Sequence, residues 1–179
     1  MIHTIQVDRI LREAVATPYT NLVTRPTGAA VRNGIQRQID AVGCSTAWLD
    51  FSAVGLIDLS CADEVVAKLL LGTDPSSNRY VLLMGIDDHH AEAIDHVLDH
   101  HSLAVAARQL TGEPLLLGRV GCDARAAFVQ VLAMGPGDAN TMATALRWTV
   151  ERAADALLAL ALLRLVAADG GSYHPLPLV

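Results

Sequence analysis

Ser60 is the residue of this sequence whose surroundings most favour a chemical switch. It stands at the predicted start of a helix, with Asp58 two residues before it and Asp63 three residues after it. A serine hydroxyl in such a place faces unpaired backbone N–H groups and the positive end of the helix dipole. A phosphate added there carries a charge of about −1.5 to −2 and is accommodated locally. Because an unpaired charge buried in an interface costs several kcal/mol, a phosphorylated Ser60 could control the binding of a partner protein.

A purely structural interpretation of Ser60 stays open beside this one. Ser60 and Asp63 have the spacing of a capping-box variant, which contributes about 1 kcal/mol and needs no regulation. If Ser60 is instead regulated, its hydroxyl is exposed and Leu59 and Cys61 form the apolar rim that a partner contacts. Asp63 would compete with phosphate for the helix N–H groups, and the nearest basic residue in the sequence is Lys68.

A second polar cluster lies between Asp87 and His101, where His and Asp alternate in pairs. Glu92, His96 and His100 follow one another at intervals of four, and such pairs on a helix can bind zinc. The opposite face of this predicted helix is apolar and packed, so we expect the polar residues of the segment to be solvated and to hold no metal.

Catalysis is not expected from this sequence. Asp50 and Asp58 lie near predicted strand ends and fit turn and cap roles, and no glycine-rich phosphate loop or Cys/His dyad accompanies them. We therefore predict a protein without catalytic residues or cofactors, which acts by binding.

Composition favours an assembly of subunits. Of the 179 residues 52% are hydrophobic and only 18% are charged, so an apolar face buried against another subunit is expected, most simply in a homodimer. The three cysteines are widely spaced and odd in number, which fits reduced thiols in the cytoplasm. Neither a signal peptide nor a transmembrane segment is predicted, so no membrane partner is expected.

Residues 20–100 alternate strand and helix patterns, which is typical of an α/β layer fold, and the first domain is predicted over residues 1–119. Segment 8–16 reads as a short helix or an irregular turn. Helices are expected to start near Thr27, Ser60 and His89, and Trp48 and Tyr80 should lie on neighbouring strands. The predicted strands cover residues 2–7, 19–25, 47–51 and 79–85, the helices 26–42, 61–71 and 89–101, and a hairpin 103–109 and 114–117.

The composition changes after Gly118, which predicts a second domain over residues 120–179. Its order, three helices followed by a hairpin, is that of a winged helix. The predicted helices cover residues 123–133, 140–146 and 149–163, with Thr149 as an N-cap, and the hairpin strands cover 164–167 and 172–176.

The segment from Leu49 to Glu64 resembles the signature of STAS domains, the family of anti-sigma-factor antagonists. That signature runs from a strand into Asp-(Phe/Leu)-Ser-x-Val and then Ile-Asp-x-Ser at a helix start, and here Asp50 to Val54 and Ile57 to Ser60 match it. The sequence is closer still to a STAS-like branch whose function is mostly unassigned, in which the helix opens Ser-(Phe)-Ala-Asp-Glu. The element order extends the resemblance over residues 20–119.

The resemblance implies a mixed sheet flanked by helices and a protein-binding, non-enzymatic role in signalling. It also implies that Ser60 is the serine that a partner kinase phosphorylates. Two departures bear on phosphorylation more than on the fold, because Leu59 replaces a frequent second serine and Cys61 replaces a frequent glycine. The expected partner, a kinase or another regulator, would contact Asp58, Leu59, Cys61 and Asp63.

A transcriptional regulator is the alternative, with the winged helix bound to DNA through Arg147, Thr149 and Arg152. The negative net charge of the chain does not favour DNA binding, because the neutralisation of phosphates by basic residues supplies most of the affinity for DNA. The net charge is −6 overall, and residues after Gly121 carry four basic and five acidic side chains, which sum to −1. Nucleic-acid binding is therefore not favoured.

Overall fold

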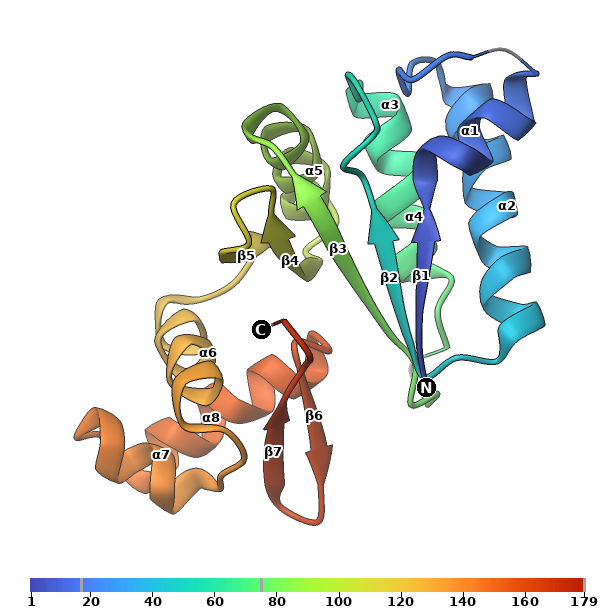
Figure 1. Cartoon of the computed structure of the whole chain (residues 1–179). Coiled ribbons are helices and arrows are strands. Elements are labelled where there is room, and N and C mark those ends of the chain that lie inside the picture. The colour runs from blue at the N-terminus through green and yellow to red at the C-terminus, as the bar shows by residue number, and fades with distance from the viewer. Residues whose placement is uncertain (17, 75, 179) are drawn as a thin grey trace. The chain divides into compact units, whose positions relative to one another are not determined.

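The computed structural model describes the whole chain except residues 17, 75 and 179. Two compact units divide it, Met1–Arg119 and Val120–Val179. The first unit is an α/β fold built on a mixed five-stranded sheet (Figure 1).

The sheet has its strands in sequence order. The first four are parallel and the fifth is antiparallel to its neighbour. Trp48 and Tyr80 lie on neighbouring strands, as predicted. The strands are β1 (Ile2–Gln6), β2 (Thr46–Asp50), β3 (Tyr80–Ile86), β4 (Ala104–Gln109) and β5 (Pro114–Gly118).

Helices connect each parallel strand to the next, and they share one core with one face of the sheet. Crossovers between parallel strands are right-handed, so a sheet that grows in one direction receives all its helices on the same face. The buried core accordingly takes alternate strand residues, such as Ala47 and Leu49, together with helix residues. The helices are α1 (Val7–Val15), α2 (Arg25–Val42), α3 (Leu59–Ala62), α4 (Lys68–Leu71) and α5 (Asp88–His100).

One π-helical turn, η1 (Asp63–Ala67), joins α3 to α4 into a continuous helical segment. The apolar spacing had predicted this helix over residues 61–71, and the structure begins it at Leu59. Nothing in the spacing signals the π turn, a feature that is frequent at functional sites.

The predicted strand at residues 19–25 is wrong. In the part of this segment that the structure describes, only Leu22 forms a bridge, to Ile57. Leu22 N–H donates to the Leu56 carbonyl at 2.7 Å, and Asp58 N–H donates to the Leu22 carbonyl at 2.9 Å. The segment therefore pairs with the loop after β2 and not with the sheet, and it brings the start of α2 next to that loop.

The described part of the second unit, residues 120–178, forms three helices and one hairpin, in the predicted order. The first strand of the hairpin begins about two residues later than predicted. Gly170 and Gly171 form the turn, and both have positive φ. Thr149 caps its third helix, as predicted, by accepting the Arg152 N–H. The elements are α6 (Cys122–Met134), α7 (Ala139–Leu146), α8 (Val150–Leu162), β6 (Val166–Asp169) and β7 (Ser172–Pro175).

Candidate functional site

A cavity of about 550 Å³ lies beside Ser60, between the start of α2, the start of α3 and the end of α5. These elements are far apart in the sequence, and the loop pairing of Leu22 brings the first of them into place. The cavity is lined by Arg25, Leu59, Ser60, Asp63, His96, Val97, His100 and His101.

Ser60 is half-buried and is not the N-cap of its helix, contrary to the capping-box interpretation. Asp58 is the N-cap: its Oδ1 accepts the Cys61 N–H at 2.7 Å and the Ser60 hydroxyl at 2.8 Å. Its Oδ2 accepts the Thr24 N–H at 3.0 Å, so one carboxylate holds both the helix start and the loop before α2. The turn and cap roles expected for Asp50 and Asp58 are confirmed, since Asp50 accepts the Ser52 N–H.

These contacts favour the ionised form of Asp58. Partial burial opposes the charge, but the hydrogen bonds from Cys61, Thr24 and Ser60 outweigh it and lower the pKa of the Asp58 carboxyl. Thr24 has φ 72, a region that a β-branched residue rarely adopts. The Asp58 carboxylate therefore fixes a strained backbone beside the cavity, which is where proteins concentrate such strain.

An Asp58→Ala variant is expected to loosen both segments at once. Loss of the helix cap lowers the free energy of unfolding by about 1 kcal/mol. The Thr24 N–H also loses its acceptor, which raises the total loss to about 2 kcal/mol. Hydrogen exchange at the Thr24 and Cys61 amides should therefore accelerate together. Asp138→Ala removes an equivalent cap from α7 and should leave both amides unchanged. If both amides in Asp58→Ala exchange as slowly as in the wild type, the Asp58 carboxylate does not hold the two segments together.

Arg25 supplies the basic group that the sequence around Ser60 lacks. Its Nη1 lies 2.8 Å from Asp63 Oδ2 and 2.9 Å from Glu64 Oε1, although Arg25 and Asp63 are 38 residues apart. Consecutive side chains of a regular α-helix point about 100° apart. Asp63 and Glu64, at the start of the π turn, nevertheless bind the same guanidinium. Asp63 is thus an ion-pair partner and does not occupy the helix N–H groups near Ser60.

Glu64 is the buried centre of this ion-pair cluster. Its side chain is 4% exposed, with Lys68 and Arg25 bound to Oε1 and Arg32 3.4 Å from Oε2. Burial opposes ionisation, but the hydrogen bonds from Lys68 and Arg25 and the nearby positive charges lower the pKa of Glu64.

Three histidines of α5 and its C-cap complete the cavity. His101 donates through Nε2 to Asp63 Oδ1 at 2.7 Å, and its ring meets that of His100 edge-on at 5.4 Å. His96 and His100 are exposed, as expected from the sequence. Within residues 1–16, 18–74 and 76–178, no group of three or more His, Cys, Asp or Glu side chains could hold a metal ion.

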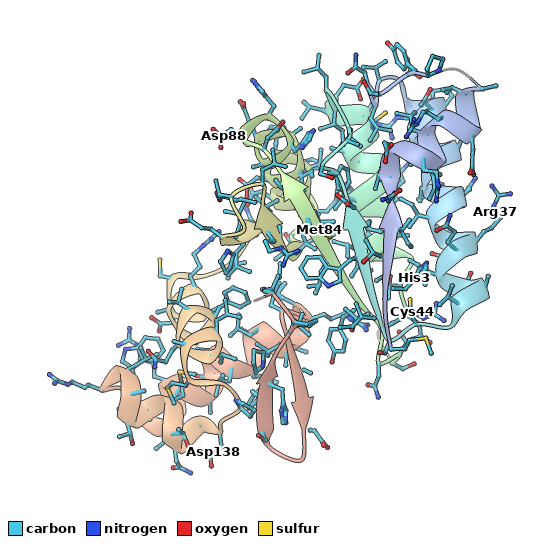
Figure 2. All side chains as sticks on the ribbon, in the orientation of Figure 1. His3, Arg37, Cys44, Met84, Asp88 and Asp138 are labelled. Atoms are coloured by element: carbon cyan, nitrogen blue, oxygen red, sulfur yellow. The ribbon has the colours of Figure 1, made fainter. Side chains whose placement is uncertain are left out.

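His90 departs from the predicted solvated surface, because its side chain is 1% exposed. Its Nε2 lies 2.6 Å from the Gly55 carbonyl, so the proton is on Nε2, and Nδ1 faces the Asp87 N–H at 3.4 Å. Asp87, just before the first residue of α5 (Asp88, labelled in Figure 2), forms a capping box with His90. The buried ring therefore holds the loop after β2 in place through the Gly55 carbonyl.

Of the predicted partner-binding residues, Leu59 is 50% exposed and Asp58 and Asp63 are half-buried. Cys61 is wrong as a surface residue, since it is fully buried with its thiol directed at the Thr24 carbonyl, 3.0 Å away. Burial, together with the charge of Asp58, raises the pKa of Cys61 to about 12, so this thiol is not a nucleophile.

The DNA-binding candidates lie at the junction of α7 and α8. Arg147 is the left-handed C-cap of α7, and Thr149 is engaged as the N-cap of α8. Arg152 makes a bidentate ion pair with Asp123, at 2.8 and 2.7 Å, and stacks over Trp148. Arg152 is therefore already committed within its own unit.

Scans of family models, of curated proteins and of solved structures found no match to this chain. No helix in the described part of the chain is both long enough and apolar enough to cross a membrane.

Proposed function

We propose that the unit Met1–Arg119 is a STAS-like signalling module that binds a partner protein without catalysis, and that phosphorylation of Ser60 sets its state. The observation that carries this proposal is the half-buried Ser60 hydroxyl on a cavity shared with Arg25 and three histidines. The resemblance of residues 49–64 to the STAS signature supports the same serine independently.

The phosphorylation step needs a partner kinase and ATP. The Ser60 Oγ would form a bond to the γ-phosphorus while the bond from that phosphorus to the bridging oxygen of ADP breaks. The hydroxyl proton would pass to the catalytic carboxylate of the kinase. Ser60 already directs this proton at a carboxylate, Asp58 Oδ1, at 2.8 Å.

The partner would bind over Leu59 and the mouth of the cavity. Leu59 and Leu56 are 50% and 58% exposed and lie on the two sides of the Asp58 cap. Apolar anchors beside a polar pocket are typical of protein interfaces. A phosphate on Ser60 would place a dianion within that interface, where it weakens binding unless the partner neutralises it.

Binding by variants tests the switch. The wild-type chain and Ser60→Ala should capture the same main partner from native extract in equal amounts. Ser60→Asp should capture at least about tenfold less of it, which corresponds to a loss of about 1.4 kcal/mol in binding free energy. Ser76→Asp is the matched control, because Ser76 donates to Asp74 as Ser60 does to Asp58.

Site mapping of phosphate on the chain purified from its own cells should find Ser60. Equal capture by Ser60→Asp and wild type, or an unmodified Ser60 under all growth conditions, would reject the switch. The three free thiols fit the cytoplasm as the place of this signalling.

For residues 120–179 we propose a winged-helix-like module that assembles subunits. Its support is the order of three helices and a hairpin, with a further bridge between Gly137 and Tyr173 through backbone hydrogen bonds of 3.0 and 2.8 Å. The DNA-binding alternative would require Arg152 to leave Asp123 and Trp148.

Homodimer formation is expected to use the exposed apolar stripe of α8. Leu158 and Leu162 are four residues apart on one helix face and are 51% and 76% exposed. The double variant Leu158→Glu/Leu162→Glu should be monomeric by light scattering at micromolar concentration, where wild type is a dimer. Leu71→Glu, at a residue 55% exposed in the other unit, is the control and should stay dimeric. A monomeric wild type would refute this assembly.

A further inference from the structure

Phosphorylation of Ser60 creates a conflict beside Asp58. In the unmodified chain the Ser60 hydroxyl donates its hydrogen to Asp58 Oδ1 at 2.8 Å. Phosphorylation removes that hydrogen and adds a charge of about −1.5 to −2 next to a carboxylate. Like charges at this distance repel, so the phosphate must turn away from Asp58.

The cavity lies next to Ser60 and holds donors for an anion. Arg25 binds Asp63 and Glu64 through Nη1 alone, and a guanidinium carries five N–H donors. The histidine side chains on the cavity wall add ring N–H groups that can donate hydrogen bonds to an anion.

Before phosphorylation, the residues that the structure describes around the cavity leave no positive charge over to neutralise a phosphate. The guanidinium and ammonium groups of Arg25, Arg32 and Lys68 face the carboxylates of Asp63 and Glu64, and Asp58 adds a third negative charge beside Ser60. α5 also carries the exposed Glu92, as well as Asp95 and Asp99, which are engaged with the Gly118 N–H and with Arg119. With neutral histidines, an added dianion is therefore uncompensated.

We propose that this cavity receives the phosphate of phosphorylated Ser60 from the same chain, bound by Arg25 and by His96, His100 and His101 in their protonated forms. The phosphate comes from the proposed phosphorylation, on which the pocket rests. The histidines gain protons as the phosphate enters, so the phosphorylated state is held more firmly at pH 6 than at pH 8. The pocket thus makes a phosphorylation signal sensitive to pH.

Phosphoserine encoded genetically at position 60 of the full chain tests the pocket without any kinase. Histidine ring signals followed by NMR across pH should show the pKa of at least two cavity histidines raised by about one unit, which is a tenfold gain in proton affinity. His89, exposed in the first turn of the same helix, should not shift. Phosphoserine at position 76 is the matched control, since that serine also donates to a carboxylate two residues earlier.

Phosphatase treatment provides a second readout that does not need the rings assigned. Phosphorylated Ser60 should lose its phosphate at least about tenfold more slowly at pH 6 than does the same chain with His96→Gln, His100→Gln and His101→Gln. Arg25→Gln should also speed the loss, whereas Arg37→Gln, further along α2 and pointing outward (Figure 2), should not.

Three results would overturn the pocket. In the first, the pKa values of the cavity histidines shift no more than that of His89. In the second, the phosphorylated variants lose their phosphate at the same rate as the phosphorylated wild type. In the third, inorganic phosphate added to the unmodified chain shifts the histidine pKa values equally, which would make the ligand a free phosphate. An unphosphorylated Ser60 in cells would refute the proposed function and leave the measurements on encoded phosphoserine standing, so the two failures are distinguishable.

Discussion

A Glu64→Gln variant is expected to lose about 3 kcal/mol of stability in the first unit. Breaking a buried ion pair from one side costs about 3 to 5 kcal/mol. The lower end is expected here, because the side chains of Arg25 and Lys68 are 53% and 37% exposed and can turn to water when the carboxylate is lost. Native-state hydrogen exchange of peptides from α2 and from the helical segment 59–71 measures the loss separately from the second unit.

The same carboxylate predicts how stability depends on pH. The pKa of Glu64 is lower in the folded chain than its ordinary value of 4.5, so the folded state favours the ionised form. Its contribution is complete above the unfolded pKa and is lost as the pH falls through the folded pKa. Glu64→Gln should therefore flatten the fall in stability at acid pH.

Glu92→Gln provides the control for Glu64, since it changes an exposed glutamate of α5. It should change stability by less than about 0.5 kcal/mol. If the two variants behave alike, Glu64 does not hold α2 against the π turn.

A Gly85→Ala variant is expected to cost about 3 kcal/mol. Gly85 has φ +70, which disfavours any side chain by about 1 to 2 kcal/mol. A Cβ there would also lie 2.5 Å from the Ser52 backbone nitrogen and 2.7 Å from the Ser52 Cβ. The β-bulge between Met84 and Ile86 thus lets β3 approach the loop after β2, and a methyl group would push that loop away.

Gly43→Ala separates backbone strain from the clash. Gly43 has φ +62, but nothing lies within 4 Å of a Cβ added there. It should therefore cost only about 1 kcal/mol. In Gly85→Ala alone, hydrogen exchange should also accelerate at Leu22 and Cys61, because the displaced loop carries their partners. Equal costs for the two variants would mean that the close approach to Ser52 is unimportant.

The elements of this fold are largely determined by the sequence itself. The apolar spacing of Ala62, Val65, Val66, Leu69 and Leu70 predicted the helix after β2, and the apolar run from residue 79 to 85 predicted the central strand β3. Both were confirmed within two residues. Such patterns are sufficient because each depends on neighbours within a few residues and on a single buried face.

The helix cap at the site was decided by tertiary structure. Local rules allowed either Asp58 or Ser60 as the cap, and the Thr24 N–H, 34 residues away, holds the Asp58 carboxylate in the position that also caps the helix. The segment around Leu22 likewise looked like a strand, but its backbone hydrogen bonds go to Leu56 and Asp58 in the loop after β2, more than 30 residues away.

The chemistry of the cavity also depends on distant segments. Ser60 could be chosen from the sequence, yet the sequence around it showed no cation, because Arg25 and His101 arrive from segments more than 30 residues away on either side. His90 looked exposed in a run of polar residues, and the Gly55 carbonyl, 35 residues away, gives its ring the partner that permits burial. Spacing along the chain specifies which face of a helix is apolar, whereas the pairing of buried polar groups is specified only when the chain has folded and their partners have met.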